Sequence, residues 1–252
     1  MMKLEYITIK GTDEQIRVYQ FFFNAVMKGN GENMVTENFN MQIRAVGTDD
    51  SKNTYEIHRK WQETGKKSLV ICLYPTISVD DCGKLDLSTM HLLNHVNQLG
   101  WGEMTIVNLY STVFDEKPLV SQLDEDNSNM AYIEEILERE DIKEYDIVIA
   151  WGSSLNTHKR TINLKIDLIS MLLDKGLADN VKCITTEKLD TCSGHGTHPL
   201  YLGLHFAKDK WTLQEFPLRN TLNELVKTIQ PVTPIVEKTK KGGKKNVSKN
   251  NE

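Results

Sequence analysis

The sequence predicts an α/β fold of three layers, in which a mainly parallel, doubly wound sheet of four strands lies between two layers of helices. From residue 67 onward, short apolar runs alternate with segments whose apolar residues recur at helical spacing. The apolar runs are continuous rather than alternating, which is typical of strands covered on both faces. Strands separated by helices of this length connect by right-handed crossovers and therefore indicate a parallel sheet.

Four strands and four helices make up this expected core, which spans residues 67–235. The helical segments carry apolar residues three and four positions apart, and the first of them has Ser88 as its N-cap and ends at Gly100. The expected strands are residues 68–74, 104–109, 145–150 and 181–185. The expected helices are residues 88–99, 130–137, 162–173 and 220–229.

Residues 1–66 are expected to form an α+β elaboration that packs on the core. A strand over residues 4–9 precedes an amphipathic helix over residues 13–27, which the following Gly-Asn-Gly sequence stops. Two more strands follow, joined by a polar turn. They are expected over residues 40–46 and 54–61.

The composition is that of a folded globular protein, with 39% hydrophobic and 26% charged residues. No apolar stretch approaches the roughly 20 residues of a membrane-spanning helix, and the first residues lack the apolar core of a secretion signal. We therefore expect a cytoplasmic protein with no membrane partner. Four cysteines without the close spacing of a zinc or iron–sulfur site indicate neither a disulfide framework nor a metal, and no cofactor is expected.

The formal charge of −5 is unevenly distributed, because the segment from residue 237 to residue 252 carries six lysines and two glutamates. This local balance of +4 leaves the rest of the chain near −9. Residues 236–252 are therefore expected to form a disordered, lysine-rich tail. Such a tail can hold a polyanion such as DNA by releasing counterions, or it can serve only to keep the protein in solution.

Four loops at the carboxyl ends of the expected strands carry an unusual number of polar and small residues. In open α/β sheets, ligands bind at this edge, so we expect one site to be built from these loops. The loops contain Tyr74-Pro75-Thr76, Asn108, Trp151-Gly152-Ser153, and His195 with His198-Pro199.

The first loop continues to Asp80 and Asp81, either of which could hold and deprotonate a water molecule or stabilise a cation. Both could instead be ordinary turn and capping residues. Asp86 is a further carboxylate, but its position just before Ser88 favours a role at the helix entry. The catalytic carboxylate is therefore expected at Asp80 or Asp81.

The other three loops supply groups that could bind a nucleobase and stabilise the negative charge that it carries when it leaves. Asn108 places a donor and an acceptor side by side, as the edge of a base requires, unless it only satisfies the loop backbone. The glycine and serines after Trp151 favour an anion, or else form a plain strand-to-helix turn. His198, fixed by a following proline, is a candidate acid or electrophile, whereas its grouping with His195 and Cys192 is a weak metal pattern.

Several ordered motifs resemble an uncharacterised bacterial and phage family. Its members share an Asn-Pro-Ser-x-x-Asp turn, a Val-Asn-Leu strand, an Ala-Trp-Gly turn and a late His-Pro-Leu, and the match covers about residues 55–217. One departure is Tyr74, which stands where the family usually has Asn. The matching segments are residues 55–61, 73–80, 100–109, 150–152 and 198–202.

The same loops, in the same order, are also similar to the uracil-DNA glycosylase superfamily. This resemblance implies a uracil-DNA glycosylase-like fold in which Asp80 or Asp81 activates water and Asn108 reads the flipped base. It also implies that His198 stabilises the departing base and that the turn at residues 151–153 supports the phosphate side. The first loop departs from the superfamily by lacking its Asp-Pro order, and the fourth has Pro-Leu in place of a serine-rich wedge.

These observations predict a DNA glycosylase-like enzyme that hydrolyses an N-glycosidic bond to release a modified base. Its setting could be base-excision repair or defence against phage with modified DNA. The chemistry needs a carboxylate to support a cationic sugar and water, and a donor to the leaving base. The alternative is a nucleotide- or small-ligand-binding or sensing protein on the same scaffold, which the acidic body favours.

Overall fold

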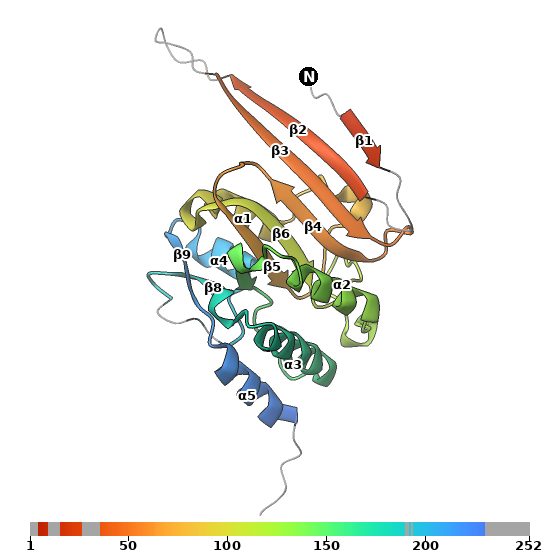
Figure 1. Cartoon of the computed structure of the whole chain (residues 1–252), viewed down its shortest axis with the longest axis vertical. Coiled ribbons are helices and arrows are strands. Elements are labelled where there is room, and N and C mark those ends of the chain that lie inside the picture. The colour runs from red at the N-terminus through yellow and green to blue at the C-terminus, as the bar shows by residue number, and fades with distance from the viewer. Residues whose placement is uncertain (1–4, 10–15, 27–35, 190–191, 193, 230–252) are drawn as a thin grey trace, which may run out of the picture.

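A single nine-stranded sheet runs through the molecule in the order β1-β2-β3-β4-β6-β5-β7-β8-β9 (Figure 1). The computed structural model describes residues 5–9, 16–26, 36–189, 192 and 194–229, and the fold is α/β overall. The lysine-rich tail expected over residues 236–252 lies outside the described residues.

The strands are β1 Glu5–Ile9, β2 Ile16–Val26, β3 Thr36–Gly47, β4 Thr54–Lys60, β5 Lys66–Cys72, β6 Trp101–Asn108, β7 Tyr145–Ile149, β8 Val181–Thr186 and β9 Trp211–Glu215. The α-helices are α1 Leu87–Leu99, α2 Asn127–Leu137, α3 Lys159–Asp174, α4 Pro199–Phe206 and α5 Leu218–Ile229. The short 3-10 turns are η1 Val79–Asp81, η2 Val120–Gln122, η3 Ile142–Glu144 and η4 Ala178–Asn180. None of the described helices is long and apolar enough to cross a membrane.

The expectation of a mainly parallel, four-stranded, uracil-DNA glycosylase-like sheet is wrong. Among the described strands, only the β6–β5, β5–β7 and β7–β8 pairings are parallel, and the other five are antiparallel. The difference arises at both sides of the sheet. β4 pairs antiparallel with β6 and extends the sheet through β3 to β1, while β9 returns antiparallel along β8. The parallel strands therefore form only the centre of a larger mixed sheet.

The helix expected over residues 13–27 is instead the strand β2. Its sequence is rich in β-branched and aromatic residues, which favour strands. β2 pairs antiparallel with β3 in continuous register from Arg17 opposite Ala45 to Val26 opposite Thr36. Backbone pairing with a long neighbouring strand therefore outweighs the helical spacing of its apolar residues.

Two elements of the carboxyl-terminal part, α4 and β9, have no counterpart in the sequence pattern. α4 has only eight residues, which is too short for helical periodicity to stand out from the surrounding loop. The start of α1 also differs from expectation, because Asp86 rather than Ser88 is its N-cap. Its side chain accepts a hydrogen bond from the Thr89 backbone N–H.

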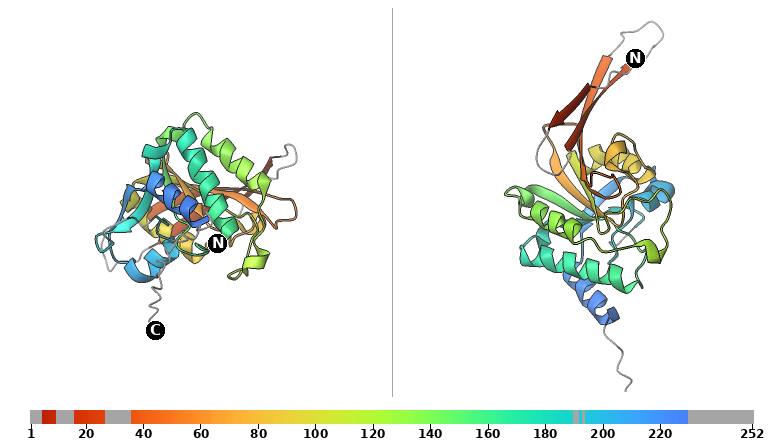
Figure 2. Two further views of the ribbon diagram at one scale, coloured as in Figure 1. Left: turned by 90° about the horizontal axis from the view of Figure 1, so that it is seen from below. Right: turned by 90° about the vertical axis from the view of Figure 1, so that its right-hand side faces the viewer.

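Helices cover the central strands on both faces (Figure 2). The two faces have separate hydrophobic cores. On β5, Leu69 and Ile71 pack into the core that contains residues of α2, α3 and α5. Val70 and Cys72 pack into the other core, which contains residues of α1 and α4. Every second residue of β5 therefore faces the same helix layer, as the period of a strand requires.

A buried network on β4 joins the amino-terminal strands to α2. The Glu56 carboxylate is fully buried and forms an ion pair with Arg44 of β3. It also accepts hydrogen bonds, each 3.1 Å long, from Arg139 and from the Tyr132 hydroxyl of α2. Burying a carboxylate is favourable only when its oxygens are paired in this way.

His58 lies beside this network, and burial lowers the pKa of its imidazole to about 4. Between pH 6.5 and about 4 the unfolded chain therefore binds a proton that the folded protein does not. We expect the free energy of unfolding to fall as the pH drops through this window, by up to about 3 kcal/mol from His58.

Urea unfolding at pH 7 and pH 4.5 measures this loss. The His58→Gln variant should lose less stability over the same interval than the wild-type protein, whereas His205→Gln should match the wild type. Equal pH dependence in His58→Gln and wild type would show that His58 does not titrate in this way.

Candidate functional site

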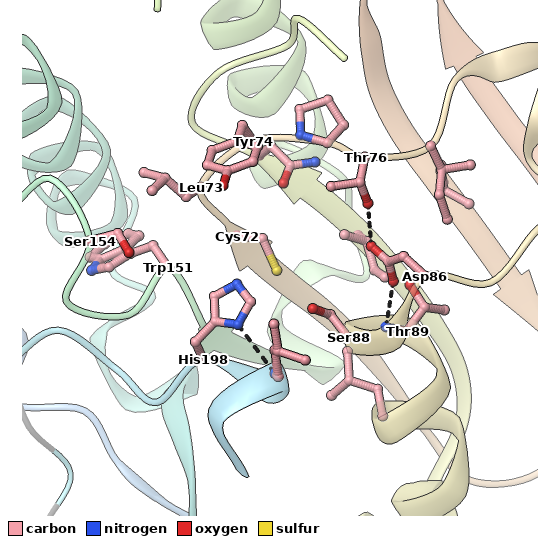
Figure 3. A pocket seen from close by; sticks show the side chains of 17 residues that line it. Cys72, Leu73, Tyr74, Thr76, Asp86, Ser88, Thr89, Trp151, Ser154 and His198 are labelled. Carbon is pink, nitrogen blue, oxygen red and sulfur yellow. Dashed lines mark hydrogen bonds between the residues drawn. The ribbon is translucent and has the colours of Figure 1, made fainter. Parts of the chain in front are cut away.

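Two adjacent cavities open at the carboxyl ends of β5, β6 and β7. The inner cavity has a volume of about 160 Å³, and the outer one has a volume of about 470 Å³. Four residues line both: Tyr74, Ser154, His198 and Leu200. The two cavities therefore lie side by side and share part of their wall, and the inner one is shown in Figure 3.

The structure brings most of the residues expected at the site to these cavities. The inner cavity is lined by Tyr74, Pro75, Thr76, Asn108, Trp151 and His198, among others. Gly152 and Ser153 line the outer cavity. Asp80, Asp81 and His195 line neither cavity.

Asp80 and Asp81 point elsewhere because the turn η1 carries them to the surface. The Asp80 carboxylate accepts a hydrogen bond of 2.6 Å from the Ser51 hydroxyl. The Asp81 carboxylate forms an exposed ion pair with Lys84 at 2.8 Å. The chain then turns back towards the sheet, and it is Asp86 that reaches the cavity wall.

The Asp86 carboxylate is held in a defined orientation at the inner cavity (Figure 3). Its Oδ1 accepts a hydrogen bond from the Thr89 backbone N–H at 2.7 Å, and its Oδ2 accepts one from the Thr76 hydroxyl at 2.5 Å. A carboxylate has about four lone-pair positions, so two such bonds leave capacity for a ligand or water. Asp86 therefore combines a role at the helix entry, as the sequence indicates, with a place in the site.

His198 lies across the cavity from Asp86, beyond Cys72 (Figure 3). It is the N-cap of α4, and its Nδ1 accepts a hydrogen bond from the Leu200 backbone N–H at 3.2 Å. A neutral imidazole whose Nδ1 accepts must carry its proton on Nε2. Burial lowers the pKa of His198, against the opposing effect of the Asp86 charge. His198 is therefore a neutral donor near pH 7.

The backbone of Gly152 makes room for this histidine. Gly152 has φ +67°, and a Cβ at this position would lie 2.9 Å from the His198 Cβ. Gly176, just after α3, has the same φ, yet a Cβ there would meet nothing within 4 Å. The two glycines therefore share the same φ, and they differ in that only a Cβ at Gly152 would contact a neighbouring side chain.

We expect Gly152→Ala to destabilise the protein by about 1–3 kcal/mol more than Gly176→Ala, because only the first pushes against His198. Urea unfolding of the two variants measures the difference, since the cost of the left-handed backbone is common to both. Equal losses of stability would mean that Gly152 does not position the histidine.

Asn108 ends β6 and is buried at the inner cavity. Its backbone carbonyl accepts a hydrogen bond from the Asn129 side chain at 2.9 Å. Within the described part of the chain, no residue forms a hydrogen bond with the Asn108 side-chain amide. The amide therefore keeps both its donor and its acceptor for a ligand.

Two further wall residues are unsuited to act as nucleophile or acid. Burial raises the pKa of the Cys72 thiol to about 12, so this cysteine remains protonated and unreactive. Trp151 is fully buried, and its ring packs edge-on against Phe216. Its flat indole supplies an apolar wall.

His195 lines neither cavity. The next residue, Gly196, lines the outer cavity, and its backbone packs so closely against Ile149 that a Cβ would lie 2.2 Å from the Ile149 carbonyl oxygen. A disulfide between Cys183 and Cys192 ties the same segment to β8. No three His, Cys, Asp or Glu side chains of the described residues gather at metal-binding distance.

A family described as "Protein of unknown function (DUF1643)" matches residues 54–200, more than half of the chain. The chain belongs to this family. The DUF1643 region begins at β4 and ends in the first turn of α4, and so includes every residue that lines the inner cavity. No curated protein and no solved structure matches the chain. None of these comparisons supports the resemblance to the uracil-DNA glycosylase superfamily.

Proposed function

We propose that this DUF1643 protein hydrolyses an N-glycosidic bond and that the inner cavity holds the nucleobase. The observation that carries the proposal is the meeting of three groups at one small cavity: the Asp86 carboxylate, the neutral imidazole of His198 and the unengaged amide of Asn108. Asp86 can accept a proton or stabilise a cation, His198 can donate a hydrogen bond to a departing anion, and Asn108 can hydrogen-bond the edge of a nucleobase.

In the proposed reaction, the bond between the base nitrogen and the anomeric carbon of the sugar breaks, and its electron pair leaves with the base. The Nε2–H of His198 donates a hydrogen bond to the anionic base, the Asn108 amide hydrogen-bonds the edge of that base, and the released base takes its proton from solvent. Asp86 stabilises the cationic sugar and accepts a proton from the water whose oxygen adds to the anomeric carbon. Asp86 therefore takes the part that the sequence predicted for Asp80 or Asp81.

The sizes of the two cavities support a nucleobase in the inner cavity and the rest of the nucleotide in the outer one. The inner volume of about 160 Å³ is below the roughly 300–1,000 Å³ of clefts for drug-sized ligands, and it suits one ring system. The outer cavity has about 470 Å³ and is lined by the hydroxyl-bearing residues Ser153, Ser154 and Thr197. In the proposal it receives the sugar and its phosphate.

Incubation with unmodified, uracil-containing and hypermodified DNA, followed by detection of abasic sites, tests the proposal. We expect abasic sites in at least one modified substrate and none in unmodified DNA. Unchanged DNA in every case, with the folded protein present in excess, would contradict glycosylase activity on DNA.

DNA is the proposed partner, and the lysine-rich tail is the proposed means of holding it. We expect deletion of residues 237–252, which removes six lysines, to weaken DNA binding and to reduce its dependence on salt. Fluorescence anisotropy with a labelled duplex between 50 mM and 200 mM salt measures both effects. A control with these lysines changed to glutamine separates charge from length, and unchanged binding in both variants would argue against the tail.

A second candidate is a protein that binds a nucleotide without cleaving it. The observation in its favour is that both Asp86 oxygens already accept hydrogen bonds, one of them as the cap of α1. A carboxylate engaged in this way can orient a ligand without activating water. Tight binding of a nucleoside monophosphate in calorimetry, with the ligand recovered intact after long incubation, would favour this candidate.

A further inference from the structure

Lys165 of α3 is a charged residue buried beside the site rather than in it. Its side chain is only 1% exposed. The ammonium donates a hydrogen bond to the Asn156 side chain at 2.9 Å and lies 5.3 Å from the centre of the Trp151 ring. Within the described part of the chain, no carboxylate forms an ion pair with it. A buried ammonium without such a partner is uncommon, because its desolvation is poorly compensated.

Both partners of Lys165 belong to the segment that joins β7 to α3. Trp151 lies near the start of this segment and lines the inner cavity, whereas Asn156 lies near its end. The residues between them include Ser153 and Ser154, which line the outer cavity. Lys165 therefore contacts the wall of the inner cavity at Trp151 and holds the segment at two points, on either side of the serines that line the outer cavity.

We propose that Lys165 is a positioning residue whose ammonium fixes the segment from Trp151 to Asn156, and that loss of its proton loosens the cavity wall. The attraction between a cation and the indole face disappears when the amine becomes neutral, while the bond to Asn156 becomes an uncharged and weaker one. The importance of this wall for a nucleobase rests on the proposed function, but its positioning by Lys165 does not.

The surroundings of Lys165 favour loss of a proton from its ammonium near neutral pH. Burial lowers the pKa of the ammonium to about 8. The titratable group that faces it from the segment before α4 is His195, whose own pKa is lowered by burial and by the Lys165 charge. Glu224 of α5 acts on His195 in the opposite direction.

Tryptophan fluorescence between pH 6 and pH 10 tests the proposal, because Trp151 is the indole in contact with the cation. We expect the wild-type protein to show a transition near pH 8 that is absent from K165M and from W151F. K165R should also lack the transition, since arginine stays protonated throughout this range.

Amide hydrogen exchange of the peptide covering residues 151–158 provides the second readout. At pH 7 we expect exchange about tenfold faster in K165M than in the wild type, and near wild-type exchange in K165R, because one charged hydrogen bond is worth about a factor of ten. A peptide from β5 should be unchanged in both variants.

The outcomes separate this inference from the proposed reaction, since neither readout needs a ligand or turnover. A transition near pH 8 that persists in K165M would overturn the inference. So would equal exchange of residues 151–158 in K165M and wild type, or faster exchange spread evenly over the whole protein. Absence of glycosylase activity together with the expected spectra would refute the proposed reaction and leave the role of Lys165 standing.

Discussion

In the proposed reaction, His198→Ala is expected to slow base release by about 10²–10³-fold, which is the usual contribution of one hydrogen-bond donor aimed at the developing negative charge. The neutral imidazole donates from Nε2 because its Nδ1 is engaged by Leu200, and alanine has no donor to replace it. Single-turnover measurement of abasic-site formation gives the rate of the chemical step. His198→Gln keeps a side-chain donor and should retain more activity than His198→Ala.

Asp86→Asn should cause a loss of similar size without unfolding the protein. Asparagine caps helices as well as aspartate does, so the bond from the Thr89 N–H can persist while the negative charge is lost. The matched controls are Asp80→Asn and Asp81→Asn, whose side chains do not line either cavity. Equal losses at all three positions, or full activity in Asp86→Asn, would remove Asp86 from the reaction.

Glu56→Gln is expected to have the largest effect on stability, about 3 kcal/mol. The change removes the charge that faces Arg44 and Arg139 while leaving the side chain buried. Breaking a buried ion pair by removing one partner typically costs about 3–5 kcal/mol. The lower end applies because both arginine side chains are about a third exposed, at 33% and 31%.

Urea unfolding at pH 7 measures this effect, with Glu63→Gln as the control. Glu63 also pairs with a basic residue, but its side chain is 83% exposed, so its loss should cost less than about 1 kcal/mol. Similar values for the two variants would show that the Glu56 network contributes no more than a surface pair.

The sequence predicts the centre of the fold well because its signals there are local and strong. β5, β6, β7 and β8 are short apolar runs, and helical periodicity marks α1, α2, α3 and α5. The convergence of Tyr74, Asn108 and Trp151 at the inner cavity follows from strand direction, since the ends of parallel strands meet at one edge. His198 lies beyond the end of β8 and reaches the cavity as the N-cap of α4.

The remaining features depend on pairing and chain path, which local patterns do not encode. Residues 16–26 form a strand rather than a helix because they pair with β3. Whether β4 and β9 join the sheet depends on partners far along the chain. Whether Asp80 or Asp86 reaches the inner cavity depends on how the turn η1 directs the chain. The role of Asp86 at the helix entry is confirmed, but the sequence named Ser88 rather than Asp86 as the N-cap.

The central claim is that water adds to the sugar while the base departs from the cavity between Asp86 and His198. The most direct measurement is mass spectrometry of the products formed in H₂¹⁸O from a DNA substrate that yields abasic sites. We predict that ¹⁸O appears in the abasic sugar and that the released base is unlabelled, with both products formed at least about 10²-fold more slowly by Asp86→Asn. Label in the base, or a substrate that remains bound and intact, would contradict hydrolysis of the N-glycosidic bond.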